Sequence, residues 1–94
     1  MIGTFQDKVL KALWERGRVK GIDAKSQARL VELLGALDAA TKPEDMDLPG
    51  YGFHGLKGNR KNQFAVEIRG NFRLVFEWEA GEAVRVRQED YHGD

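Results

Sequence analysis

Two histidines, a lysine and a group of arginines are the residues of this 94-residue chain that could transfer protons or hold a phosphate. Residues 54–73 (HGLKGNRKNQFAVEIRGNFR) hold one histidine and one acid, Glu67, together with five basic residues: Lys57, Arg60, Lys61, Arg69 and Arg73. Residues 74–94 hold six acids against two arginines. The net charge of zero therefore conceals a local basic field. Such a field favours a phosphate chain as ligand, because electrostatic attraction fades within about 10 Å in ordinary salt.

Arg69 and Arg73 flank a Gly-Asn dipeptide, which is typical of a tight turn between two strands. Alternation along each strand directs both arginines away from their apolar neighbours, so we expect them side by side, or nearly so, on one face of a sheet. Two adjacent guanidiniums repel each other, and a phosphate between them would remove the conflict because each can bond two oxygens. The alternative is a pair of solvated arginines in ion pairs with Glu67 or Glu77.

The two histidines stand in different settings. His54 and Lys57 lie on HGLKG, where flanking glycines leave the backbone open to a ligand. His92 stands in the closing EDYHGD; if this tail extends the last strand, Asp90 and His92 share one face and Tyr91 takes the other. A carboxylate beside an imidazole favours its protonated form and fixes its orientation. The alternatives are an ordinary surface histidine at position 54 and a frayed polar tail.

Several kinds of site are excluded by residue types. Two histidines without a cysteine do not make a zinc set, and the acids lack calcium-loop spacing, so no metal is expected. No glycine-rich phosphate loop precedes a helix, and the only serine, Ser26, falls within an expected helix, so we expect neither a nucleotide cofactor nor a serine triad. The remaining set suits RNA cleavage by its own 2′-hydroxyl: a base takes the hydroxyl proton, cations hold the phosphate oxygens, and an acid protonates the leaving 5′-oxygen.

The elements that position these residues follow from apolar spacing. Three- to five-residue spacing predicts a first helix from about Phe5 to the capping Gly17, and a second helix from Asp23 to about residue 40. Residues 1–4 are a candidate short strand, and residues 41–52, with both prolines, predict a loop. Alternation predicts three strands, over residues 64–69, 73–78 and 83–87. The expected fold class is α+β, with two N-terminal helices packed on a twisted antiparallel sheet that has one apolar and one charged face.

Length and composition predict one domain spanning residues 1–94. With 41% hydrophobic and 32% charged residues the chain has the composition of an ordinary folded protein. No apolar run approaches the roughly 18–20 residues of a membrane span, and the N-terminus lacks a signal-peptide pattern. We therefore expect a cytoplasmic protein without membrane contact.

HGLKGNRKNQFAVEIRGNFRLVFEWEAGEA, together with the closing DYH, closely resembles the HigB branch of the RelE/ParE toxin superfamily. The opening MIGTFQDKVLKALWERG and the later LDAAT match as well, so the resemblance covers nearly the whole chain. It implies a RelE-like microbial RNase fold and the toxin of a type II toxin–antitoxin pair. Such a toxin is a ribosome-dependent mRNA endonuclease that cuts in the ribosomal A site without metal. A helix-turn-helix antitoxin of the HigA type neutralises it.

The resemblance also implies roles, residue by residue. His54, Asp90, Tyr91 and His92 resemble the family's catalytic group, Lys57 and Arg73 its phosphate-holding cations, and Arg69 and Asn71 residues next to the substrate. Arg60 and Lys61 of the basic stretch are expected to bind RNA as well. The chain departs from the family pattern at Asn62, where many members have glycine, and at Glu67, where an acid would weaken RNA affinity. The alternatives are a toxin on the same scaffold that binds a protein target such as a topoisomerase, and a non-catalytic RNA-binding module.

Overall fold

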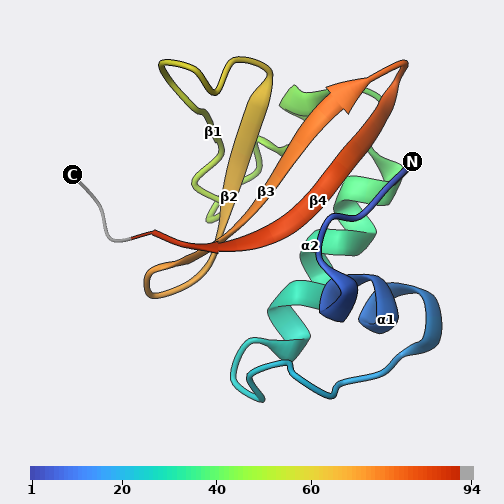
Figure 1. Ribbon diagram of the computed structural model, residues 1–94. Coiled ribbons are helices and arrows are strands. Elements are labelled where there is room, and N and C mark those ends of the chain that lie inside the picture. Colours follow the sequence, from blue (N-terminus) through green and yellow to red (C-terminus); the bar gives the residue numbers. More distant parts are fainter. Residues whose placement is uncertain (92–94) are drawn as a thin grey trace.

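The computed structural model describes residues 1–91 and has two helices beside a four-stranded sheet (Figure 1). In chain order the elements are α1 (Lys8–Arg16), α2 (Gln27–Ala39), the 3-10 helix η1 (Pro43–Met46), β1 (His54–Gly55), β2 (Gln63–Arg69), β3 (Phe72–Glu79) and β4 (Glu82–Asp90). The strands lie in the order β1-β2-β3-β4, and each pairs antiparallel with the next. The α+β fold class predicted from the sequence is confirmed.

Helix α1 begins later than the apolar spacing predicts. The Asp7 side chain accepts hydrogen bonds from the backbone N–H groups of Val9 and Leu10, at 2.9 and 3.1 Å, and so caps a helix that begins at Lys8. Phe5 precedes this cap and forms a parallel bridge with Val86 of β4. The expected first helical residue therefore belongs to an extended N-terminal segment that pairs with the sheet.

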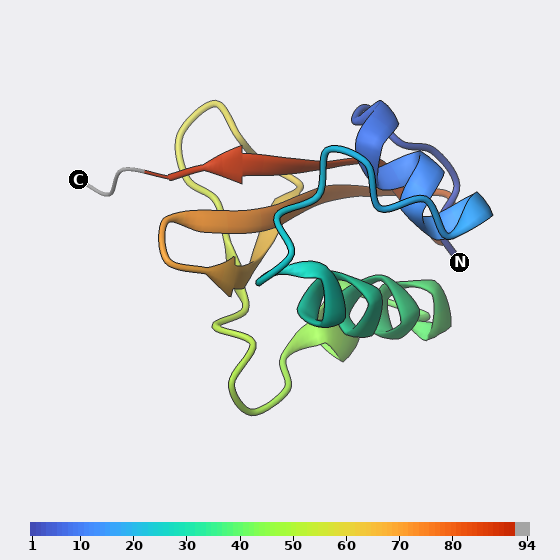
Figure 2. The same ribbon diagram turned by 90° about the horizontal axis from the view of Figure 1, so that it is seen from below.

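Helix α2 carries the apolar face that fills the core. Four leucines of this helix are fully buried: Leu30, Leu33, Leu34 and Leu37. Figure 2 shows α2 along one side of the sheet, with α1 next to the N-terminal segment. On the same side of the sheet, Leu74 and Phe76 of β3 are fully buried in the same cluster, and the Phe64 ring stacks on Phe76. We call the opposite side of the sheet, which carries Arg73, Glu77, Arg87 and Glu89, the open face.

The segment predicted as a loop contains more structure than its composition indicates. Met46 of η1 is fully buried, and Tyr51 donates a hydrogen bond to Glu32 at 2.9 Å. Burial, followed by this hydrogen bond, raises the pKa of Tyr51. The Arg29 guanidinium lies 4.9 Å from the centre of the Tyr51 ring and donates to the Gly50 and Glu67 carbonyls, at 2.8 and 3.0 Å. These contacts fix the path of the chain as it enters β1.

The hairpin between β3 and β4 has an unfavourable residue in its turn. Ala80 and Gly81 have φ values of 52° and 80°, the two positive angles of a type I′ turn. Alanine in this left-handed region costs about 1–2 kcal/mol, whereas asparagine tolerates it. Ala80→Asn should therefore stabilise the protein by about 1 kcal/mol, raising the midpoint of thermal unfolding by roughly 4–8 °C. Ala80→Val should lower the midpoint, and circular dichroism measures both; an unchanged midpoint in both variants would contradict the proposed strain.

Candidate functional site

His54 reaches the open face because β1 adds a short strand to the sheet edge. His54 lies opposite Ala65 of β2, Ala65 opposite Val75 of β3, and Val75 opposite Arg87 of β4. Side chains in one such row point to the same face. His54 is exposed there, in the row next to the one formed by Glu67, Arg73 and Glu89. The sequence did not predict β1, because two residues are too few for a visible alternation.

The His54 ring is held through one nitrogen. Its Nδ1 lies 2.9 Å from the Gly52 carbonyl oxygen, which can only accept a hydrogen bond, so Nδ1 carries a proton. In the neutral ring, Nε2 is then the nitrogen that can accept a proton. Gly52 has φ 59°, and a Cβ there would lie 2.5 Å from a carboxylate oxygen of Glu67. Glycine at position 52 therefore permits the turn that gives His54 its partner.

Arg73 is buried rather than solvated, being only 8% exposed. Its guanidinium lies 4.1 Å from the centre of the Tyr91 ring and forms an ion pair with Glu89, with Nη2 and Oε1 3.4 Å apart. Its Nε is buried, and no group within residues 1–91 forms a hydrogen bond with it. The alternative of a solvated arginine paired with Glu67 or Glu77 is wrong for Arg73.

Arg69 and Arg73 are not paired across the hairpin. Arg73 lies opposite Glu67, and Arg69 lies opposite Phe72 beyond a register shift between positions 67 and 69. Arg69 is exposed at the end of β2. The two arginines, expected side by side or nearly so, are therefore not in direct register, because the irregularity offsets Arg69 from Arg73.

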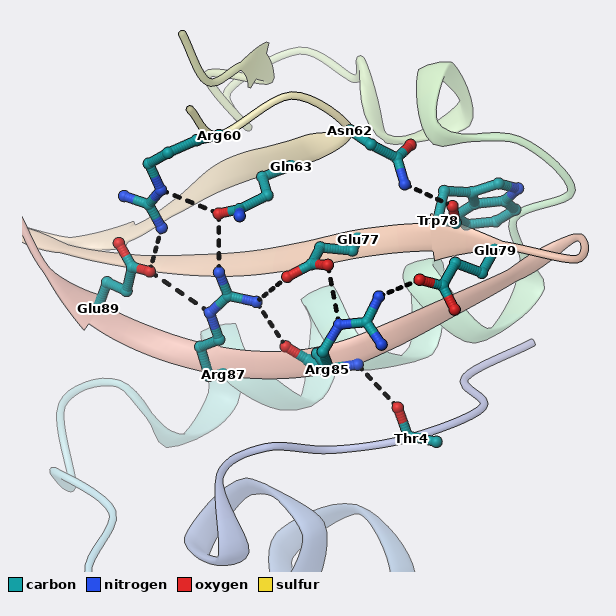
Figure 3. A network of polar contacts seen from close by, with 10 residues as sticks. All are labelled: Thr4, Arg60, Asn62, Gln63, Glu77, Trp78, Glu79, Arg85, Arg87 and Glu89. Carbon is teal, nitrogen blue, oxygen red and sulfur yellow. Dashed lines mark hydrogen bonds and ion pairs between the residues drawn. The ribbon is translucent and has the colours of Figure 1, made fainter. Parts of the chain in front are cut away.

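A polar network covers the open face between β2 and β4 (Figure 3). Arg87 donates to Glu77 at 3.0 Å and to Gln63 at 2.9 Å, and Gln63 also accepts from Arg60 at 2.9 Å. Glu77 accepts from Arg85 at 2.8 Å. Burial opposes ionisation of Glu77, but the hydrogen bonds from Arg85 and Arg87 outweigh it and lower its pKa. The acids of β3 and β4 thus lie among the arginines, so the open face is not the plain basic field that the linear charge pattern predicts.

The C-terminal candidates separate at the end of β4. The strand extends to Asp90, which lies opposite Phe72 and lines a pocket with Asp23 and Ser26 on the helix side of the sheet. Tyr91 lies on the open face over Arg73. The expected alternation of Asp90 and Tyr91 is confirmed, but it places Asp90 away from Arg73. His92 lies outside the described residues.

The remaining candidates lie on the loops that connect the strands. Lys57 and Lys61 are exposed on the connection between β1 and β2. Asn71, in the turn between β2 and β3, is exposed, and its carbonyl accepts a hydrogen bond from the Tyr91 N–H at 2.6 Å. Asn62 has φ 64° and donates to the Trp78 carbonyl at 2.7 Å. Asparagine is among the few residues that adopt this angle readily, which explains how it can replace a glycine there.

A family description covers almost the entire chain. The family model described as RelE-like toxin of type II toxin-antitoxin system HigB matches residues 3–92 of this chain. The chain belongs to this HigB family. It is also 36% identical over 92 residues to the Endoribonuclease HigB of Proteus vulgaris, across 98% of this chain and 100% of that protein. The Toxin HigB-1 of Vibrio cholerae serotype O1 is 33% identical over 82 residues, across 85% of this chain and 86% of that protein. As a type II toxin, the HigB-family protein has an antitoxin partner.

Two negative findings concern the described part of this HigB-family toxin. Residues 1–91 contain no group of three histidine, cysteine, aspartate or glutamate side chains that could hold a metal ion. No helix within the same range is long and apolar enough to cross a membrane.

Glu89 and Arg87 belong to the polar network of the candidate site, although the sequence predicted neither of them as a site residue. Glu89 contacts three arginines, and its pKa is lowered, first by the hydrogen bond from Arg60, against the opposing effect of burial. The signal was present in Arg85-Val86-Arg87-Gln88-Glu89, where charged residues alternate. This pattern predicts a short third strand over residues 83–87, which ends before Glu89 and assigns that acid no partner.

Proposed function

We propose that this HigB-family toxin is a metal-independent endoribonuclease that cuts messenger RNA in the A site of the ribosome. The family membership and the activity named for the Proteus vulgaris relative support RNA cleavage. The observation that carries the proposal is the presence of His54, Arg73 and Tyr91 on the same open face, with Nε2 of His54 left as a proton acceptor.

In the proposed reaction the 2′-hydroxyl of the RNA attacks the adjacent phosphorus. His54 takes the hydroxyl proton, and Arg73 and Lys57 hold the non-bridging oxygens as negative charge grows on them. The bond to the 5′-oxygen breaks as His92, assigned from the family resemblance, donates its own proton to that oxygen. Tyr91 acts at the phosphate beside Arg73. Asp90 lies on the helix side of the sheet, so we do not place it at the phosphate. Its proposed role is indirect, in positioning the C-terminal residues that follow it.

The loop residues extend the proposed RNA contact beyond the cleaved bond. Arg60, Lys61, Arg69 and Asn71 bind the flanking chain, chiefly through its phosphates, which is the usual source of affinity for nucleic acid. The antitoxin is proposed to be a helix-turn-helix protein of the HigA type. The site of action is the cytoplasm, where ribosomes translate.

Expression of the wild-type chain alone should arrest a bacterial host and deplete its messenger RNA. Primer extension should locate new 5′ ends on programmed ribosomes and none on free RNA, because the A site presents the substrate. EDTA should not slow cleavage once magnesium is restored to keep the ribosomes assembled. Co-expressed antitoxin is the control. Normal growth with intact transcripts, at confirmed expression, would refute the proposal, and a zinc or manganese requirement would refute its metal-free chemistry.

A further inference from the structure

Three arginines from three parts of the chain converge on Glu89. Arg60 comes from the connection between β1 and β2, Arg73 from β3 and Arg87 from β4. Arg73 contacts Oε1 of Glu89 at 3.4 Å, whereas Arg87 at 3.4 Å and Arg60 in a short hydrogen bond both contact Oε2. Figure 3 shows Glu89 between Arg60 and Arg87. One carboxylate thus joins the connection between β1 and β2 to strands β3 and β4.

The convergence requires an anion. Guanidiniums this close repel one another, and the repulsion is strong here because the Arg73 and Arg87 side chains are only 10% and 13% exposed. The hydrogen bond from Arg60 leads the effects that lower the pKa of Glu89, so this carboxylate is ionised at neutral pH. It therefore supplies the charge that keeps the three arginines together.

Arg73 depends on Glu89 more than the other two arginines do. Arg60 and Arg87 share Gln63 as a second partner, and Arg87 also bonds Glu77 and the Arg85 carbonyl. Among the described residues, the Arg73 side chain forms one ion pair, with Glu89, and one aromatic contact, with Tyr91. The Tyr91 ring limits tilting of the Arg73 guanidinium, and the ion pair with Glu89 limits its movement within its own plane.

We propose that Glu89 is a positioning residue for RNA cleavage, which holds the Arg73 guanidinium where the phosphate of the substrate will lie. This inference rests on the proposed function. An arginine has five N–H donors, so Arg73 retains donors for a phosphate while it contacts Glu89. Holding it in place removes the reorganisation that would otherwise accompany the transition state.

A different role for Glu89 would be that of a stand-in for the phosphate, which the substrate must displace. The geometry favours positioning. Oε2 of Glu89 is held by Arg60 and Arg87, so displacement of Glu89 by a phosphate would break both of these contacts. The two roles predict opposite changes in the cleavage rate when the charge of Glu89 is removed. The rate should fall if Glu89 positions Arg73, and it should stay equal or rise if Glu89 is a stand-in that the phosphate must displace.

The test is single-turnover cleavage on programmed ribosomes by Glu89→Gln, across a series of toxin concentrations. The maximum rate should fall about 10- to 100-fold, as expected when a reacting group is misplaced. The concentration for half-maximal rate should stay equal or fall, because the variant has no negative charge next to the phosphate. Glu89→Asp keeps the charge and should recover part of the rate. Glu79→Gln, an equal charge change at an exposed carboxylate paired with Arg85, should leave both values unchanged.

A double-mutant cycle separates positioning from general damage. If Glu89 acts through Arg73, then Glu89→Gln should cost little further rate when Arg73 is already alanine. Additive losses, or a rate equal to or above wild type in Glu89→Gln, would overturn the inference. Should Glu89→Gln fail to fold by circular dichroism, the cycle is run with Glu89→Asp, and the same two outcomes decide. A wild-type protein that does not cleave RNA would refute the proposed function instead.

Discussion

Arg73→Ala should slow single-turnover cleavage on programmed ribosomes by about 10²–10³-fold, the scale of losing one preorganised donor to a developing oxyanion. Arg73 is buried and contacts the Tyr91 ring and Glu89, so its guanidinium is already held before RNA binds. Arg73→Lys should recover only part of the rate. An ammonium keeps the charge, but it has neither the planar shape that stacks on Tyr91 nor the two-pronged donor set.

Arg69→Ala is the matched control, since it makes the same charge change at an exposed end of β2. It should leave the maximum rate near wild type and weaken RNA binding. The salt dependence of binding should also flatten, by a log–log slope of roughly 0.7 for each single-strand phosphate that the variant no longer neutralises. A salt series on wild type and the three variants measures both quantities. Cleavage by Arg73→Ala at the wild-type rate would show that the open face is not the active site.

His54→Ala should reduce the maximum rate by about 10²–10⁴-fold, the usual contribution of a positioned general base. The structural reason is the tautomer: Nδ1–H is bound to the Gly52 carbonyl, so Nε2 is the proton acceptor that alanine lacks. His54→Asn should be similarly slow, because its amide can donate to Gly52 but accepts protons poorly.

The His54 variants should retain their fold and nearly their full affinity for RNA. His54 is exposed on a two-residue strand, and its proposed role is to take a proton rather than to hold the phosphates. The same concentration series separates maximum rate from affinity, and circular dichroism checks the fold. Gln27→Ala, at an exposed position where α2 begins, is the control. If either His54 variant cleaved as fast as wild type, another group would have to be the base.

The regular elements were predictable because their signals are local. Alternating apolar residues and the turns at Gly70 and Ala80 predict β2, β3 and most of β4. The leucine spacing predicts the buried face of α2. The predicted elements are wrong where a capping side chain or a strand distant in sequence determines where an element begins or whether it forms. Asp7 moves the start of α1 past Phe5, and β1 exists only because β2 pairs with it.

The site was predictable in its residue types and not in its contacts. His54 and Arg73 stand out as a histidine and an arginine in a basic stretch. The carboxylate that holds Arg73 is 16 residues away, and Arg60 is 29 residues from the same acid. Which acid meets which arginine depends on the register of β4 against β3. That register shifts between Val75 and Glu77, and no local sequence signal reports the shift.

The pairing of the N-terminal segment with β4 has a consequence for solubility. Gly3 and Gln6 donate to the Ala83 and Val86 carbonyls at 2.7 and 3.0 Å, and these two residues donate back to the carbonyls of Met1 and Thr4, at 3.0 and 3.1 Å. Strand edges with unpaired backbone groups are templates for edge-to-edge aggregation. Here the outer edge of β4 is already occupied over this stretch. A toxin released from its antitoxin therefore does not expose that edge to other copies of itself.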